Sequence, residues 1–229
     1  MFTQLTKLSA IILVSLTANT LFPEWANMTT EEKILQAAED ELLEHGYEGA
    51  RMRSISEKAE INKGLLHYYF KSKEALLIKV FQKTFREIFG SLEEVFQSSA
   101  PLFEKVKLAV DKYSEFLMKH PRLPLFIITE VNRNPAKHMM RMRKAGVTPP
   151  FGPLIKELEE GKTSGLIRKD YASHQFMLNM MGLILFPFIA KPMVMFMNNM
   201  NQADYKKLLE NRKKEVAALL INDIKANTK

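Results

Sequence analysis

The chain has 229 residues, of which 46% are hydrophobic and 26% charged, a composition that excludes a disordered or collagen-like protein. It contains no cysteine, which excludes disulfide scaffolds, cysteine nucleophiles and cysteine-ligated metal sites and favours a reducing compartment. The 33 Lys and Arg residues outnumber the 26 Asp and Glu residues, and the resulting net charge of +7 favours an anionic partner such as nucleic acid or a membrane surface.

The first 27 residues differ in character from the rest. Lys7 precedes an apolar run, Leu8 to Leu16, which is too short to span a bilayer but long enough for the apolar part of a signal peptide. No small-x-small cleavage triplet follows before Pro23. Residues 1–27 therefore have three interpretations: translation from a misplaced start codon, which we favour, an extra N-terminal arm or helix, or an export signal.

Helix signals and hydrophobic periodicity organise residues 28–100. Thr29 and Glu32 have the spacing of a capping box, and the helix that they open is predicted to end at Gly46. A short second helix follows, and a third is predicted from about residue 62 to residue 70. Ser72 is placed to cap a long fourth helix with an apolar stripe at helical spacing. The stripe comprises Leu76, Leu77, Val80, Phe81, Phe85, Ile88, Phe89, Leu92 and Phe96.

Prolines divide the chain beyond residue 101 into further helices. Proline removes a backbone donor and disfavours a helical conformation in the residue before it. Breaks are therefore predicted at Pro121, Pro135 and the Pro149–Pro150 pair.

The remaining third of the chain is also predicted to be helical. Gly161 to Gly165 is interpreted as a loop. Residues 171–200 form a very apolar stretch that Pro187 and Pro192 interrupt, and the last helix begins near Gln202. No segment shows sustained strand alternation flanked by turn residues, so the predicted fold class is all-α.

Charge is divided unevenly within residues 28–80. Residues 28–48 carry one Lys against seven acids, a net charge of −6, whereas residues 49–80 carry seven basic residues against three acids, a net charge of +4. Three short helices with a tight turn between the second and third describe a helix-turn-helix unit, and the basic part would attract phosphate. The alternative that this polarity is only a solvated surface without a partner stays open at this point.

An aromatic run sharpens the interpretation as a DNA-binding unit. The run His67-Tyr68-Tyr69-Phe70 lies at the end of the third helix, immediately before Lys71. These four residues point in every direction around a helix, so some must face solvent. Tyr hydroxyls, His and Lys at a helix end are suited to phosphate oxygens. We expect Phe70 to be part of the core.

The run from Arg51 to Leu76, RMRSISEKAEINKGLLHYYFKSKEAL, resembles the DNA-binding signature of the TetR family of bacterial transcriptional regulators. Lys63-Gly64, Tyr69-Phe70 and Ser72-Lys73-Glu74 are its most diagnostic pieces. The resemblance implies a helix-turn-helix DNA-binding head at residues 28–80, joined by a long helix to a helical ligand-binding and dimerisation bundle at residues 81–229.

The resemblance also implies roles for individual residues. Lys63, Gly64 and Leu65 would open the recognition helix and face base edges, and His67 stands where a phosphate-binding Tyr is usual. Lys73, at the start of the fourth helix, would meet a phosphate with help from the helix dipole. The full set of expected DNA-binding residues is Arg51, Arg53, Lys63, Gly64, Leu65, His67, Tyr68, Tyr69 and Lys73.

One departure from the family pattern concerns the turn of the helix-turn-helix unit. The usual glycine of the turn is Glu60 in this chain. If that position has a left-handed backbone, a residue with a Cβ costs about 1 kcal/mol there.

The second domain is expected to hold a small apolar or amphipathic ligand and to form the homodimer. Seven of the 14 Met residues lie in residues 171–200, and Met suits adaptable apolar pockets, although each could equally be plain core or interface. The candidate pocket residues are Phe126, Phe176, Met177, Met180, Met181 and Phe186. The candidate dimer-interface residues, on a last helix that would form a four-helix bundle with its partner, are Leu209, Val216 and Leu220.

Signals for catalysis are weak. The five His residues are scattered without metal-ligand spacing, and no glycine-rich phosphate loop is present, so no catalytic residue, metal or cofactor is predicted. The expected function is that of a cytoplasmic, ligand-responsive repressor that binds a palindromic DNA operator as a homodimer, with no membrane partner. The alternative is an exported or membrane-anchored helical binding protein that uses the N-terminal apolar run as its signal.

Overall fold

A computed structural model of the protein describes residue 25 and residues 27–226. The apolar run from Leu8 to Leu16, with its three interpretations, lies outside the described residues. Within them, all regular elements are helices, and the one β-bridge joins Ile167 to Lys225. The prediction of an all-α fold is therefore confirmed. Backbone contacts divide the chain into two compact units, the first ending at Val80 and the second beginning at Phe81.

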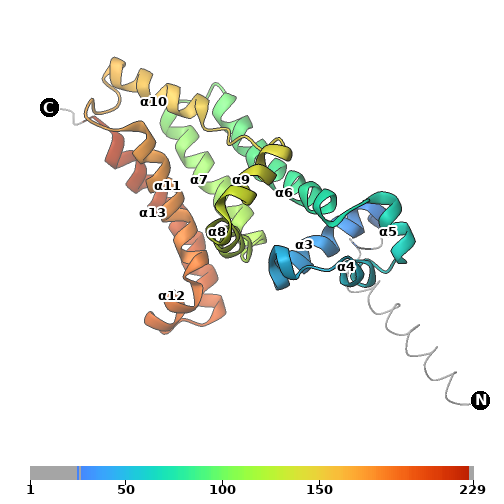
Figure 1. The fold of residues 1–229 in the computed structure, drawn as a ribbon. Coiled ribbons are helices and arrows are strands. Elements are labelled where there is room, and N and C mark those ends of the chain that lie inside the picture. The colour runs from blue at the N-terminus through green and yellow to red at the C-terminus, as the bar shows by residue number, and fades with distance from the viewer. Residues whose placement is uncertain (1–24, 26, 227–229) are drawn as a thin grey trace, which may run out of the picture. The chain divides into compact units, whose positions relative to one another are not determined.

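The first unit contains three helices and the start of a fourth (Figure 1). They are α3 (Thr30–Gly49), α4 (Met52–Lys58), α5 (Lys63–Tyr69) and the beginning of α6 (Lys73–Gln97). The capping box predicted before α3 is present, since the Thr29 hydroxyl accepts from the Glu32 backbone N–H at 3.3 Å and the Thr29 N–H donates back to the Glu32 carboxylate at 2.7 Å. The core of the unit is built from Ile34, Ala38, Leu42, Ile55, Leu66, Leu76 and Leu77.

Gly46 only interrupts the first helix of this unit. Its φ of 69° is left-handed, which breaks the helical path, but helical turns resume and continue to Gly49. The predicted break at Gly46 is therefore present, and a short helical stretch follows it to Gly49.

The second unit is an all-helical bundle. Its helices after α6 are α7 (Leu102–Lys119), α8 (Leu123–Arg133), α9 (Pro135–Lys144), α10 (Gly152–Ser164), α11 (Ser173–Ile189), α12 (Lys191–Met197) and α13 (Gln202–Ile224). The breaks near Pro121, Pro135 and Pro149 fall where they were predicted. Helices α7, α11 and α13 pack together as the centre of the bundle, and Figure 1 shows α11 and α13 side by side.

Gly161 is part of a helix and does not begin a loop. Helix α10 continues through it to Ser164, and Gly165, with a φ of 81°, forms the left-handed end of the helix. A Cβ on Gly161 would lie 2.6 Å from Cγ1 of Ile167. Glycine is therefore required at position 161 because Ile167, in the segment after the helix, packs against it. The prediction of a loop at residues 161–165 is wrong for residues 161–164, which are helical.

Pro187 lies inside α11 without ending it. A proline cannot donate to the carbonyl four residues earlier, which here belongs to Leu183. The Arg212 side chain of α13 supplies the missing donor, with Nε 3.1 Å from the Leu183 oxygen. The prediction that Pro187 interrupts the helix is thus wrong, whereas Pro192 stands in the first turn of α12, where a proline is tolerated.

A search of the described helices finds none that is long and apolar enough to cross a membrane by itself. Helices α11 and α12 satisfy the length and composition criteria only when taken together, and they are bent by 75° at the break between them.

Candidate DNA-binding head and ligand cavity

The turn between α4 and α5 has a left-handed backbone at the position where the family pattern has glycine. Glu60 has a φ of 57°, so a side chain occupies a left-handed position. The turn is closed by a hydrogen bond from the Ile61 N–H to the Ser56 carbonyl at 3.0 Å. Asn62 then caps α5, its side-chain oxygen accepting from the Leu65 N–H at 2.8 Å. These bonds set the direction in which α5 leaves the turn.

One side of α5 is buried and the rest of the helix is exposed. Leu66 and Phe70 anchor the helix in the core, as predicted for Phe70. The exposed residues are Lys63, Gly64, Leu65, His67, Tyr68 and Tyr69, which are six of the nine candidate DNA-binding residues. Tyr68 is 81% exposed, which is unusual for an aromatic side chain without a partner. The helix therefore presents a polar and aromatic surface to solvent.

Gly64 lies where a side chain would interfere with the helix cap. A Cβ at this position would come 3.2 Å from the Asn62 oxygen that caps the helix. A substitution here would therefore disturb the first turn of α5 as well as its outer surface.

The two arginines of the head are both exposed, and they differ in their contacts. The Arg51 backbone N–H donates to the Glu41 carboxylate at 3.3 Å. The Arg53 side chain pairs with Glu57 at 2.8 Å on the outer face of α4. Such an exposed pair contributes little to stability, so Arg53 can exchange Glu57 for a phosphate at small cost.

Lys73 has a structural role that the sequence did not indicate. Its ammonium donates to the Glu48 carbonyl at 3.1 Å and lies 5.1 Å from the centre of the Tyr47 ring. The Tyr47 hydroxyl in turn donates to the carboxylate of Glu74. Lys73 therefore ties the end of α3 to the start of α6, in addition to standing at a helix N-terminus.

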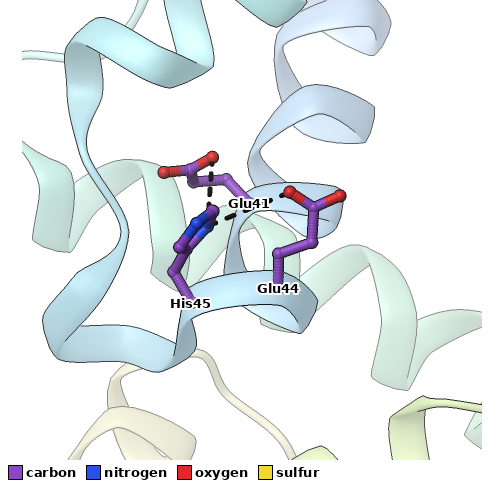
Figure 2. Close-up of side chains that lie close together, drawn as sticks. All are labelled: Glu41, Glu44 and His45. Atoms are coloured by element: carbon purple, nitrogen blue, oxygen red, sulfur yellow. Dashed lines mark ion pairs between the residues drawn. The ribbon is translucent and has the colours of Figure 1, made fainter.

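A cluster of charged side chains joins α3 to α4, and Figure 2 shows its three members from α3. Glu41, Glu44 and His45 offer ligand atoms within 4.8 Å of one another, a spacing compatible with a metal ion. However, the Lys58 ammonium lies 3.0 Å from Glu41 and 2.5 Å from Glu44, so a cation already neutralises these carboxylates. The Glu41 side chain is 2% exposed and also accepts from the Ser54 hydroxyl at 2.6 Å. We interpret the cluster as the ionic contact that fixes α4 on α3.

The electrostatics of Glu41 agree with this interpretation. Burial by itself would raise the pKa of the carboxyl group, but the hydrogen bonds from Ser54, Lys58 and the Arg51 backbone outweigh it, and the net pKa is lowered. The carboxylate is therefore ionised at neutral pH, as its ion pair with Lys58 requires.

The second unit contains an apolar cavity of about 400 Å³, within the usual size range for small-molecule sites. Helices α6, α7, α8, α9 and α11 contribute to its wall. Its apolar lining includes Phe85, Phe89, Phe116, Ile127, Met142 and Phe151. A larger groove of about 580 Å³ at the start of α13 is more open and lined mainly by polar side chains, so the apolar cavity is the better candidate for a ligand site.

Three of the residues that line the cavity have polar side-chain atoms: Thr84, Tyr113 and His138. His138 is 3% exposed, and its Nδ1 has no hydrogen-bond partner within the part of the chain that the structure describes. Burial, followed by the positive charge of Arg141, lowers the pKa of His138, with Glu130 opposing the shift. Burial raises the pKa of Tyr113 to about 12. Both groups are therefore uncharged at neutral pH.

Comparison with known proteins identifies the head. Residues 34–80 match the family described as bacterial regulatory proteins, tetR family. The chain is 25% identical over 138 residues to the fatty acid metabolism regulator protein of Bacillus subtilis, covering 60% of this chain and 70% of that protein. It is 26% identical over 152 residues to the HTH-type transcriptional repressor NicS of Pseudomonas putida, covering 65% of this chain and 71% of that protein. Residues 34–80 thus form a TetR-family DNA-binding domain.

The likeness to solved TetR-family structures extends over both units. The transcriptional regulator FadR from Bacillus subtilis, solved in complex with stearoyl-CoA, aligns with a TM-score of 0.64 and 22% identity, covering 84% of this chain and 98% of that one. At this identity the likeness establishes the fold. The chain is a DNA-binding transcriptional regulator, and the comparisons give no support to the alternative of an exported binding protein.

Few of the predicted pocket residues line the cavity. Of the six, only Met181 lines it. Phe176, Met177 and Met180 are buried in the core, Phe186 is half-exposed, and Phe126 stacks on Phe81 with ring centres 6.4 Å apart. Helix α11 is apolar on all sides, so its composition did not reveal which side faces the cavity. The better signal was the Phe85–Phe89 pair in the stripe of the long helix.

The predicted dimer-interface residues are also misplaced. Leu209, Val216 and Leu220 are buried within the chain's own core, where α13 packs on α7 and α11, and they have no surface left for a second chain. The sequence showed an apolar face on the last helix, but that face is occupied within the same chain. Exposed apolar side chains on other sides of these helices are Leu178, Phe186 and Leu219.

Proposed function

We propose that this regulator is a repressor that binds a near-palindromic operator as a homodimer and releases it when a small, mainly apolar molecule fills the cavity of the second unit. Residues 28–80 would be the DNA-binding domain, and residues 81–229 would bind the ligand and form the dimer. The cytoplasm, where the operator lies, is the place of action. The observation that carries the proposal is that one chain combines an exposed helix α5, capped by Asn62, with an apolar cavity in its second unit.

The surface of α5 supports recognition of DNA in the major groove. The helix begins with the exposed residues Lys63, Gly64 and Leu65, and the first turn of a recognition helix is the part that reaches base edges. Tyr68 and Tyr69 follow toward its end, where their hydroxyls are suited to phosphate oxygens. Arg51, at the N-cap of α4, and Arg53, on its exposed face, precede α5 in the sequence, and His67 adds a further donor.

A homodimer follows from the need for two heads on a near-palindromic site, whose half-sites lie about 34–36 Å apart for helices in successive major grooves. The exposed Leu178 and Phe186 of α11 and Leu219 of α13 provide apolar surface for the association. Asn179 of α11 is bonded to Asp223 of α13 at 3.3 Å, which places Leu178 and Leu219 on adjoining turns of the two helices.

Ligand release requires that the ligand bind better to a conformation of the dimer whose heads are wrongly spaced for DNA. Helix α6 is the covalent link for this coupling, since it begins at Lys73 in the first unit and carries Phe85 and Phe89 into the cavity wall of the second. A tenfold loss of DNA affinity needs only about 1.4 kcal/mol of coupling free energy. The stearoyl-CoA of the Bacillus subtilis FadR structure supports an acyl chain as one candidate ligand.

The proposal is tested by selecting DNA fragments from a random pool with the purified full-length chain. We expect enrichment of a near-palindrome and a stoichiometry of one dimer for each site. A monomer at micromolar concentration that binds all duplexes alike would refute the proposal. Molecules that raise the thermal unfolding temperature are then titrated with and without the operator. By linkage, a true effector loses the same factor of affinity when the operator is bound.

Two lysine variants assign roles within the head. Lys63→Ala is expected to change which bases are preferred, because Lys63 stands in the first turn of α5. Lys73→Ala is expected to weaken binding to all duplexes and to lower the salt slope by about one unit, as a lost phosphate contact does. Because Lys73 also bonds to Glu48, the unfolding temperature of this variant must be measured beside its affinity.

A further inference from the structure

The wall of the cavity combines a large apolar surface with very few polar groups. Among the described residues, no Lys, Arg, Asp or Glu side chain lines it, and the polar atoms belong to Thr84, Tyr113 and His138. His138 is almost fully buried, yet its Nδ1 lacks a hydrogen-bond partner there. A buried polar atom without a partner costs about 1–3 kcal/mol, so such atoms are rare and call for an explanation.

We propose that the cavity selects a mainly apolar ligand that carries one uncharged hydrogen-bonding group, such as a hydroxyl or carbonyl, and that His138 binds this group. The inference rests on the proposed function insofar as it takes the cavity to be the ligand site. It adds the chemical class of the ligand and the residue that recognises it.

The surroundings of His138 favour an uncharged group. The imidazole is neutral at neutral pH, and a neutral imidazole can donate through one nitrogen and accept through the other, so it can serve a hydroxyl or a carbonyl. A carboxylate in the cavity would lose its hydration without gaining a cation on the wall. An uncompensated buried charge costs far more than a buried hydroxyl. The charges nearest to His138 are Arg141 on its own helix and Glu130 on α8, which oppose each other in their effect on it.

The geometry also holds His138 in place. Its ring contacts Phe81 edge-on, with ring centres 5.7 Å apart and planes at 85°. Phe81 in turn stacks on Phe85, which lines the cavity, at 6.3 Å. The imidazole therefore has a defined orientation beside the apolar wall, which is what selective recognition of one polar group requires.

Three probes of one ring system test the proposal: naphthalene, β-naphthol and β-naphthoate, titrated into the full-length protein without DNA. We expect β-naphthol and naphthalene both to bind at neutral pH, and β-naphthoate to bind most weakly of the three. His138→Phe is expected to weaken β-naphthol binding by about three- to tenfold, the value of one hydrogen bond, and to leave naphthalene within about twofold.

Two further variants serve as controls. His138→Gln retains a donor and an acceptor and is expected to recover part of the β-naphthol affinity. Met181→Leu changes the apolar wall at nearly constant volume and is expected to alter all three affinities by the same factor. Thermal unfolding of each unliganded variant shows whether it is folded. If His138→Phe is unfolded, the β-naphthol and naphthalene affinities of the wild type are compared with those of His138→Gln instead.

The proposal is overturned if His138→Phe weakens naphthalene and β-naphthol equally, since the ring would then be only part of the wall. It is also overturned if β-naphthoate binds most tightly, or if none of the probes binds. Because DNA is absent from these titrations, a failure of operator binding or release, which would refute the proposed function, leaves their outcome unchanged.

Discussion

At the scale of single residues, Glu60 and His138 both occupy positions that the local rules disfavour. Glu60 places a side chain in a left-handed turn, and His138 places an imidazole in an apolar wall. Each has a cost in stability that the rest of the fold offsets. Their consequences can be measured separately, because Glu60 lies in the first unit and His138 in the second.

Replacing Glu60 by Gly is expected to stabilise the first unit. Glycine adopts a φ near 57° without the penalty of a Cβ, although it gains entropy in the unfolded chain. We expect the free energy of unfolding to rise by about 0.5–1 kcal/mol, measured by urea denaturation. Glu60→Ala is the matched control, since it removes the same charge and keeps the Cβ. Equal stabilities of the two variants would show that charge, and not backbone conformation, is responsible.

The buried imidazole predicts a pH dependence of stability. The pKa of His138 is lower in the folded chain than the ordinary value of 6.5, because burial and Arg141 disfavour its charged form. The unfolded chain therefore takes up this proton at a higher pH than the folded chain, and the free energy of unfolding falls as the pH drops through 6.5.

We expect His138→Phe to lose less stability than the wild type between about pH 8 and about pH 5.5, measured by thermal unfolding in the absence of ligand. The other histidines contribute equally to both proteins and cancel in the comparison. A difference between the two proteins that is constant over this range would contradict the lowered pKa.

At the scale of elements, α11 shows how one helix depends on its neighbour. Pro187 leaves the Leu183 carbonyl without its helical donor, and Arg212 of α13 donates to it instead. The Tyr205 hydroxyl of α13 also donates to the Pro187 carbonyl, at 3.0 Å. Arg212 thus replaces the helical donor that the proline lacks, whereas Tyr205 donates to a carbonyl in the last turn of α11, where helical donors run out.

A double-mutant cycle tests this dependence. Arg212→Met is expected to destabilise the chain by about 1 kcal/mol, because it leaves the part-buried Leu183 carbonyl without its donor. Pro187→Ala restores a backbone N–H, so in that background the same Arg212→Met change is expected to cost clearly less. The measurement is the unfolding free energy of the four proteins. Additive effects would mean that Arg212 acts through other contacts.

At the scale of the whole molecule, the two faces of the last helix differ in burial. The face with Leu209, Val216 and Leu220 completes the core of the chain, whereas Leu219 remains on the surface, as does Leu178 of α11. A stable homodimer would bury these exposed side chains. The proposed function needs such a dimer, because one head alone reads only half of a palindrome.

Introducing a charge at the exposed positions is expected to separate the protomers. Leu178→Glu and Leu219→Glu replace side chains that are 61% and 53% exposed, so the folded monomer should tolerate both. Sedimentation equilibrium should show dissociation constants raised by at least about tenfold, since each burial is worth about 1.5–3 kcal/mol. Leu125→Glu, on α8 and 51% exposed, is the control and should remain dimeric. Unchanged association of both variants would place the interface elsewhere.

Much of the fold could be predicted from the sequence because its signals are local. The capping box at Thr29, the cap at Asn62 and the helix-breaking prolines act through neighbours within about one helical turn. The turn at Glu60 was likewise indicated by the sequence, because Glu60 stands where the family pattern has glycine. The candidate DNA-binding residues of α5 could be predicted for the same reason. When Leu66 is buried, the other side chains of so short a helix must be exposed.

The lining of the cavity and the apolar side chains left exposed were decided only by the tertiary structure. Helix α11 is apolar all round and the last helix has apolar residues on more than one side, so composition and period do not distinguish core, cavity and interface. Arg212 opposite Leu183, and His138 beside Phe81, are pairs far apart in the sequence that meet through packing. The sequence by itself therefore determined the helices, their order and the DNA-binding head, because local hydrogen bonding and periodicity specify them. Only the packing of the helices decided which apolar side chains line the cavity and which remain exposed, because contacts between distant segments set both.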